Sequence, residues 1–163
     1  LATVTHHDLP DDHCPFCRFV AGDDTPFNTR ADIVHQDDDV MAFISPRWWP
    51  NNPGNVIIIP CRHFADIYDL PDDLLGKIVV AGKRIAVAMK AAYGCDGTSL
   101  RQHNESAGGQ DVFHFHLHVF PRWLGDRLYQ NADAHRFASS DERRPYAERL
   151  RMHLGAEGLS AAP

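Results

Sequence analysis

The stretch FHFHLHVF, at positions 113–120, is the most informative part of this sequence for the fold. Side chains alternate between the two faces of a β-strand, so the strict alternation predicts one strand with two different faces. His114, His116 and His118 share one face, and the other face is apolar: Phe113, Phe115, Leu117 and Val119. The alternative interpretation is a solvated polar face, since the chain contains 11 histidines in 163 residues.

A glycine-bearing loop, NESAGGQD at positions 104–111, stands directly before this strand. Small residues let backbone N–H groups approach an anion, as they do in phosphate-binding loops. A plain hairpin loop is the alternative for two adjacent glycines taken alone. Because this loop would deliver its amides next to three histidines, the combination indicates phosphoryl or nucleotidyl chemistry.

Length and composition predict one soluble globular domain. A chain of this length buries about 70% of its unfolded surface, and a content of 44% hydrophobic and 23% charged residues is ordinary. The net charge of −6 disfavours nucleic-acid and membrane partners. The longest aliphatic run, residues 56–59, is too short to span a bilayer. No secretory signal is recognisable, so we expect a cytoplasmic protein.

The hydrophobic patterns predict an α+β fold in which a mainly antiparallel sheet carries one long helix. We expect a flexible N-terminal arm at residues 1–13, a single domain at 14–155 and a frayed tail at 156–163. The expected strands are 33–36, 40–44, 56–59, 98–103 and 113–120. The expected helices are 14–20, 74–93 with Gly94 at its end, and 141–154 with Gly155 as its stop.

The four cysteines are unevenly spaced, with Cys14 and Cys17 in a C-x-x-C motif and Cys61 and Cys95 apart. This pattern favours metal or redox chemistry over a disulfide scaffold. The motif is interpreted as a redox pair, a zinc half-site or two buried thiols. No strand is predicted before Cys14, although a thioredoxin-like motif would need one.

Three further motifs accompany the histidine strand. HFHLHVF at 114–120 matches His-φ-His-φ-His-φ-φ, in which φ is apolar, and GQDVF at 109–113 resembles a Gly-Gln-x-Val lead-in. PGNVIIIPCRH at 53–63 resembles Pro-Gly-His-x-φ-φ-φ-Pro-x-x-His, and CPFC at 14–17 resembles Cys-x-Phe-Cys. On these motifs the chain resembles the histidine triad (HIT) superfamily, in particular its bacterial zinc-bearing type.

The resemblance implies a HIT-like fold and a defined chemistry. It implies about five strands, a long helix packed on the sheet, a C-terminal helix and a homodimer. His116 would attack the α-phosphorus of a nucleotide, and water would then hydrolyse the nucleotidyl-histidine. A neutral imidazole can attack through one nitrogen when an acceptor holds the other. His118 would be the second catalytic residue, and the implied nucleotide-binding residues are Phe43, Asn104, Gln110, Asp111, Val112 and His118.

The resemblance also implies a structural zinc ion. Zinc-bearing members bind the metal with two cysteines, an upstream histidine and the first histidine of the triad. The corresponding residues here are Cys14, Cys17, His63 and His114. A Cys₂His₂ set is a closed tetrahedral arrangement that holds segments together without taking part in the reaction.

Two positions depart from the family pattern. Many members carry an Asp for the ribose hydroxyls shortly after the Ala-Phe pair, where this chain has Ser45-Pro46. Many carry a small hydroxyl residue after Gly-Gln, where this chain has Asp111. Asp111 is interpreted as a general acid, as a determinant of the preferred leaving group, or as a surface loop residue.

The leading hypothesis is a nucleotide hydrolase or transferase that resembles the nucleoside phosphoramidases. A dinucleoside polyphosphate hydrolase or phosphorylase is the first alternative. The second is a zinc-stabilised nucleotide-binding protein with little turnover.

Overall fold

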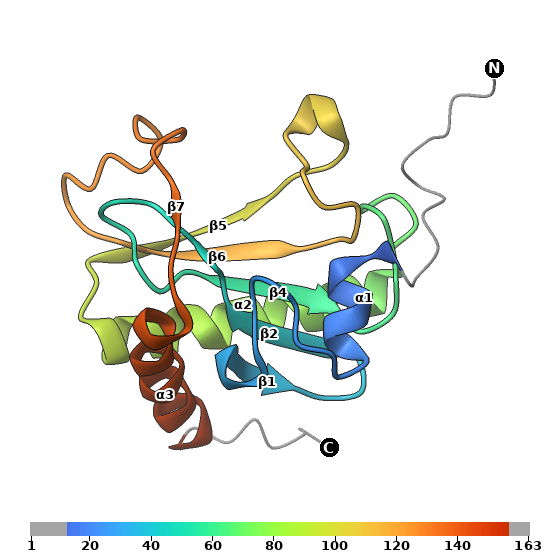
Figure 1. The fold of residues 1–163 in the computed structure, drawn as a ribbon, viewed down its shortest axis with the longest axis horizontal. Helices are drawn as coiled ribbons and strands as arrows, with labels where there is room; N and C mark the ends of the chain where they lie inside the picture. Colours follow the sequence, from blue (N-terminus) through green and yellow to red (C-terminus); the bar gives the residue numbers. More distant parts are fainter. Residues whose placement is uncertain (1–12, 157–163) are drawn as a thin grey trace.

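The computed structural model describes residues 13–156, so the predicted arm and tail lie almost entirely outside it. Five strands form one antiparallel sheet in the order β1-β2-β4-β6-β5 (Figure 1). Their bounds are β1 Ile33–Gln36, β2 Val40–Ile44, β4 Val56–Pro60, β5 Gly97–Gln102 and β6 Leu117–Arg122. The predicted α+β fold is confirmed. Within the described residues, no helix has the length and apolar character needed to cross a membrane.

Each face of the sheet is covered by different helices. The long helix α2 (Asp72–Tyr93) and the C-terminal helix α3 (Ser140–Ala156) contribute to a large core on one face. The short helix α1 (Pro15–Val20) lies on the other face, over a smaller cluster that contains Phe43 and Ile57 (Figure 1). Because β2 and β4 are covered on both faces, their sequences are continuous apolar runs.

Several element boundaries differ from the predictions by one or two residues, and the start of β6 differs by four. The strand expected from Phe113 begins only at Leu117, and the amide of Phe115 donates instead to the carbonyl of Phe64 in the loop after β4 (2.6 Å). The last helix continues through Gly155, where no left-handed residue interrupts it. By contrast, Gly94 ends α2 with φ of 65°, as predicted.

The C-terminal segment folds back onto the domain. Its short strand β7 (Arg136–Phe137) pairs with β3 (Arg47–Trp48), so the chain after β6 returns to the face that carries α1 (Figure 1). Arg143 of α3 then makes a bidentate ion pair with Asp32, at 2.8 and 2.9 Å, and both side chains are buried. This pair links the last helix to the segment before β1.

The Asp32–Arg143 pair predicts a large effect of one substitution. Arg143→Met should lower the free energy of unfolding by about 3–5 kcal/mol, because it leaves a buried carboxylate without its cation. Arg144 is the matched control, since its ion pair with Asp141 (3.1 Å) is exposed. Arg144→Met should change stability by less than about 1 kcal/mol. Equal losses for the two variants in urea unfolding would contradict this role.

Candidate active site and metal centre

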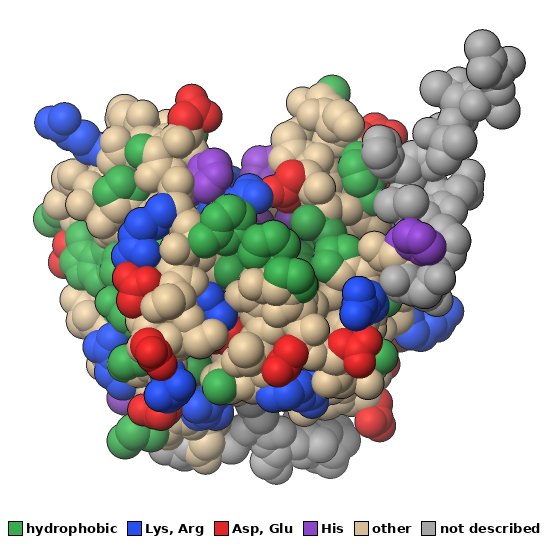
Figure 2. Space-filling view, in the orientation of Figure 1, with side chains coloured by type: hydrophobic (Ala, Val, Ile, Leu, Met, Phe, Trp, Pro, Cys, Tyr) green, Lys and Arg blue, Asp and Glu red, His purple; other side chains and the backbone are tan. Residues whose placement is uncertain are grey.

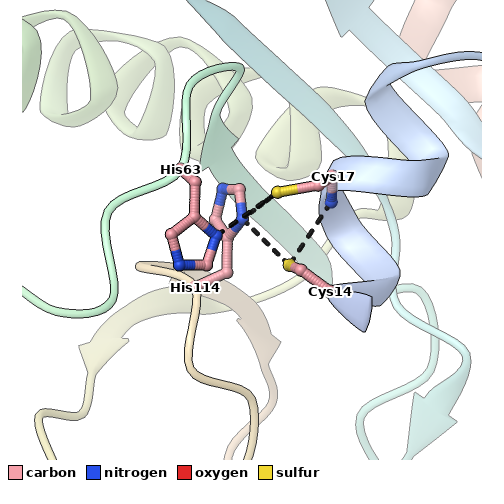
Figure 3. A group of neighbouring side chains, drawn as sticks. All are labelled: Cys14, Cys17, His63 and His114. Carbon is pink, nitrogen blue, oxygen red and sulfur yellow. Dashed lines mark hydrogen bonds between the residues drawn. The ribbon is translucent and has the colours of Figure 1, made fainter. Parts of the chain in front are cut away.

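Four potential metal ligands converge from three segments of the chain (Figure 3). Cys14 and Cys17 come from the beginning of α1, His63 from the turn after β4, and His114 from the segment before β6. Their ligand atoms all lie within 4.8 Å of one another. The sulfur of Cys14 is 3.3 Å from Nδ1 of His114, and the sulfur of Cys17 is 3.3 Å from Nδ1 of His63. The four residues predicted as metal ligands are thus brought together.

The chemistry of the four side chains fits zinc. Zn–S bonds of about 2.3 Å and Zn–N bonds of about 2.0–2.1 Å in a tetrahedron separate sulfur and nitrogen by about 3.5 Å. Nε2 of His114 is 2.9 Å from the carbonyl of Pro60. Because a carbonyl only accepts, Nε2 carries the hydrogen and the lone pair of Nδ1 faces the cysteines. Burial lowers the pKa of His114 to about 4, so the imidazole is neutral, as a metal ligand must be.

His116 is held in the orientation that a nucleophile requires. Its Nδ1 lies 2.8 Å from the backbone carbonyl of His114 and donates its hydrogen to that carbonyl. The lone pair is therefore on Nε2, which lies 3.8 Å from a carboxylate oxygen of Asp111. Burial lowers the pKa of His116, and the hydrogen bond to His114 and the charge of Asp111 offset this only in part. The imidazole is neutral at pH 7.

His116 opens onto a cavity of about 220 Å³ on the face of the sheet that carries α1. One part of its wall is aromatic and aliphatic: Phe16, Phe19, Phe27, Ile57 and Phe137. The other part is polar and carries most of the charge: Arg47, Arg101, His103, Asp111, His116 and His118. Figure 2 shows histidine side chains in a hollow between two raised parts of the surface, with hydrophobic side chains gathered along its lower edge. The cavity therefore offers an apolar region beside a polar one.

Asp111 forms an ion pair inside this cavity. Its carboxylate lies 2.6 Å from Nη1 of Arg47. Burial raises the pKa of Asp111. The charge and hydrogen bond of Arg47, together with the charge of His116, lower this pKa by more than burial raises it, so the net shift is downward. Asp111 is therefore a carboxylate at neutral pH and has no proton to donate. The general-acid interpretation of this residue has no support in this arrangement.

Three of the predicted nucleotide-binding residues do not line the cavity. Phe43 lies beneath α1, in edge contact with Phe16 and Phe19. The side-chain amide of Gln110 donates to the carbonyls of Ala65 (2.5 Å) and Val112 (3.0 Å).

The side chain of Asn104 is likewise taken up by the protein. It accepts from the amide of Ile67 (3.0 Å) and exchanges hydrogen bonds with Gln102. Asn104 and Gln110 therefore brace the loop. Val112, Asp111 and His118 do line the cavity.

Ser45 stands shortly after the Ala-Phe pair, near the position at which the resemblance implies an Asp for the ribose hydroxyls, and it lines the cavity. Its hydroxyl accepts from the amide of Arg47 and donates to the carbonyl of the same residue, both at 3.2 Å. The cavity also contains residues that the sequence reasoning missed, among them Arg47, Arg101 and Phe137. Arg101 follows the alternation of β5, but only the pairing of β5 with β6 shows that it faces the site.

Comparison with known proteins agrees with this geometry. The model of the HIT domain family matches residues 27–123, which is more than half of the chain. The chain belongs to the HIT family. An uncharacterised HIT-like protein of Mycobacterium tuberculosis is 35% identical over 115 residues, which cover 71% of this chain and 75% of that protein. An adenylylsulfatase of Arabidopsis thaliana is 26% identical over 123 residues, 76% of this chain and 59% of that enzyme.

A zinc-bound relative supports the metal centre of this HIT protein. The crystal structure of a zinc-bound histidine triad family protein from Mycobacterium smegmatis matches with a TM-score of 0.74 and 28% identity. The match covers 91% of this chain and 97% of that one. Together with the cluster of Cys14, Cys17, His63 and His114, this similarity identifies a site for structural zinc.

The metal centre predicts that Cys17→Ser removes both zinc and stability. Loss of a residue that only orients a metal ligand lowers metal affinity by about 10–100-fold. Loss of the ligand itself should therefore lower zinc affinity by more than about 100-fold. Thermal unfolding should shift downward, since binding of a structural metal is coupled to folding. Cys61→Ser is the control, because burial and nearby aspartates raise the pKa of the Cys61 thiol to about 11 and it lies outside the cluster. Elemental analysis that finds no zinc in protein purified without chelators would overturn the assignment.

Proposed function

We propose that this HIT protein is a nucleotide hydrolase or transferase that cleaves at the α-phosphate through a covalent nucleotidyl-histidine. Nε2 of His116 attacks the α-phosphorus and forms an N–P bond while the bond to the leaving group breaks. Water then attacks the same phosphorus, releases the nucleoside monophosphate and restores the neutral imidazole. The substrate is a nucleotide with a phosphoramidate or phosphoanhydride bond.

The observation that carries this proposal is the hydrogen bond between Nδ1 of His116 and the carbonyl of His114 (2.8 Å). It selects the tautomer whose lone pair is on Nε2, in the wall of the cavity. A neutral imidazole with its second nitrogen held in this way is an activated nucleophile. The alternative interpretation of the histidines as a solvated polar face would leave this ring exposed to water. His116 is instead only 3% exposed.

The surrounding groups suit an α-phosphate. Nδ1 of His118 is buried without a hydrogen-bond partner among the described residues, and the His118 ring lies 5.1 Å from that of His116. We assign His118 to the phosphate oxygens or the leaving group. The amide of Val112 is the proposed phosphate donor of the loop, because Gly109 and Gln110 already donate theirs to loop carbonyls. Gln110 and Asn104 keep the loop in place.

The apolar part of the cavity suits a nucleoside. Ile57 and Phe16 lie in its wall, and Phe43 supports Phe16 from below. Ser45 cannot replace a ribose-binding carboxylate directly, because its hydroxyl hydrogen is donated to the carbonyl of Arg47. The proposal leaves two alternatives for experiment: a dinucleoside polyphosphate hydrolase or phosphorylase, and a nucleotide-binding protein with little turnover.

We also propose a homodimer. β5 is an edge strand of the sheet, and Leu100 on this strand is 45% exposed. Val79 and Val87 on α2 are exposed to a similar degree. An open edge next to exposed aliphatic side chains is a suitable surface for a second copy of the chain. Sedimentation at micromolar concentration should give twice the chain mass of 18.3 kDa. A clean monomer would refute the dimer.

His116→Ala should abolish turnover while leaving nucleotide binding in place. We expect a loss of about a thousandfold or more, because no other group supplies the nucleophile. AMP should still bind, since the loop amides and the apolar wall are unchanged. His153→Ala is the matched control, because His153 lies on α3 and outside the cavity.

The measurement is turnover of adenosine phosphoramidate, diadenosine tetraphosphate and adenylyl sulfate. In addition, wild-type protein quenched during turnover should carry an acid-labile nucleotidyl adduct on the peptide containing His116. The enzyme assignment is wrong if His116→Ala keeps most of its activity on every substrate.

A further inference from the structure

A row of paired residues crosses the sheet through the catalytic strand. Phe43 of β2 pairs with Ile57 of β4, Ile57 pairs with His118 of β6, and His118 pairs with Arg101 of β5. Paired residues on neighbouring strands point to the same face, and the strands are about 4.8 Å apart. The row therefore places apolar residues on one side of His118 and an arginine on the other.

Arg101 is held in the cavity wall by aromatic rings. Its guanidinium carbon lies 4.7 Å from the centre of the Phe120 ring and 5.5 Å from the Trp49 ring. No hydrogen bond or ion pair joins the side chain of Arg101 to any other residue in the part of the chain that the structure describes, and its Nε is buried without a partner. A half-buried cation stacked on aromatic rings without an anion is suited to bind one.

No carboxylate in the cavity is available to neutralise Arg101. Among the described residues that line the cavity, Asp111 is the only carboxylate, and it pairs with Arg47 at 2.6 Å. Burial lowers the pKa of Arg101, and the attraction of Tyr129 and Asp111 only partly offsets this effect. An anionic group next to the guanidinium would relieve the cost of burying its charge.

We propose that Arg101 forms the subsite for the leaving group and that it selects substrates whose leaving group is an anion. The substrate class is then nucleoside 5′-phosphates activated by sulfate, phosphate or a polyphosphate, rather than by an amine. This inference rests on the proposed function, since it concerns the group that departs when His116 attacks.

The charges around His116 favour the same class. An amine must take up a proton before it can leave, whereas sulfate or phosphate departs with the electron pair of the broken P–O bond and needs no proton. Asp111 is ionised in its ion pair with Arg47 and cannot supply that proton. A guanidinium beside the departing oxygens stabilises the charge that develops on them. Arg101 is thus placed for an anhydride and offers nothing to an amine.

The test compares two substrates that differ only in the leaving group, adenylyl sulfate and adenosine 5′-phosphoramidate. In Arg101→Gln, the ratio of kcat/KM for the sulfate over the phosphoramidate should fall by about 100-fold. Arg101→Lys should retain part of the ratio, because the charge remains. The control is Arg149→Gln, which removes an arginine held over the rings of Tyr93 and Tyr146 outside the cavity. Arg149→Gln should keep the wild-type ratio.

A binding measurement separates failure of this inference from failure of the proposed function. By calorimetry, wild-type protein should bind α,β-methylene-ADP about tenfold more tightly than AMP, and Arg101→Gln should lose this preference. If wild-type protein turns over both substrates and Arg101→Gln keeps the ratio, the subsite is wrong and the proposed function stands. If no substrate is turned over, the proposed function fails, and the calorimetric preference alone decides whether Arg101 binds the anion.

Discussion

His114 connects the metal centre to His116, the proposed nucleophile, and the geometry of the whole site depends on it. One ring nitrogen of His114 faces the cysteines, and the other donates to the carbonyl of Pro60 in the neighbouring strand. Its own carbonyl accepts the hydrogen bond from Nδ1 of His116. A zinc ion bound by the His114 side chain would therefore hold the backbone group that orients the nucleophile. The structural metal and the proposed reaction would thus both depend on one short segment.

The sheet places an apolar part and a charged part of the cavity on opposite sides of β6, and we propose that they receive the two halves of a substrate. β4, on one side of β6, supplies Ile57, and the short helix α1 closes this part of the cavity with Phe16. β5, on the other side, supplies Arg101. Because strand pairing sets this order, the separation of apolar and charged regions follows from the topology. The C-terminal segment adds Phe137 to the wall, from residues beyond the match to the family.

Local patterns predicted the helices and the five strands of the main sheet, whereas the metal ligands and the proposed nucleophile came from the resemblance to the HIT superfamily. Apolar runs such as 56–59 and the alternation at 113–120 depend on neighbouring residues alone, so they are legible in the sequence. The position of Arg101 beside His118 depends on the register between β5 and β6. The Asp32–Arg143 pair joins residues 111 positions apart. Neither has a local pattern.

Two residues of the recognised motif have contacts within the protein that the sequence does not reveal. Asn104 and Gln110 were expected to contact phosphate, whereas their amides bond to the protein. Spacing identifies the loop in which a residue lies, but it does not show whether the side chain or the backbone faces the ligand. Hydrogen-bond partners far away in the sequence decide that question.

The proposed attack by His116 requires that the carbonyl of His114 hold His116 as the tautomer with its hydrogen on Nδ1. Long-range ¹H–¹⁵N correlation spectra of ¹⁵N-histidine-labelled, zinc-loaded protein at pH 7 test this claim most directly. We expect His116 to show a protonated Nδ1 and an unprotonated Nε2, with His116→Ala providing the assignment. A His116 ring that carries its hydrogen on Nε2, or that is an imidazolium at this pH, would contradict the account.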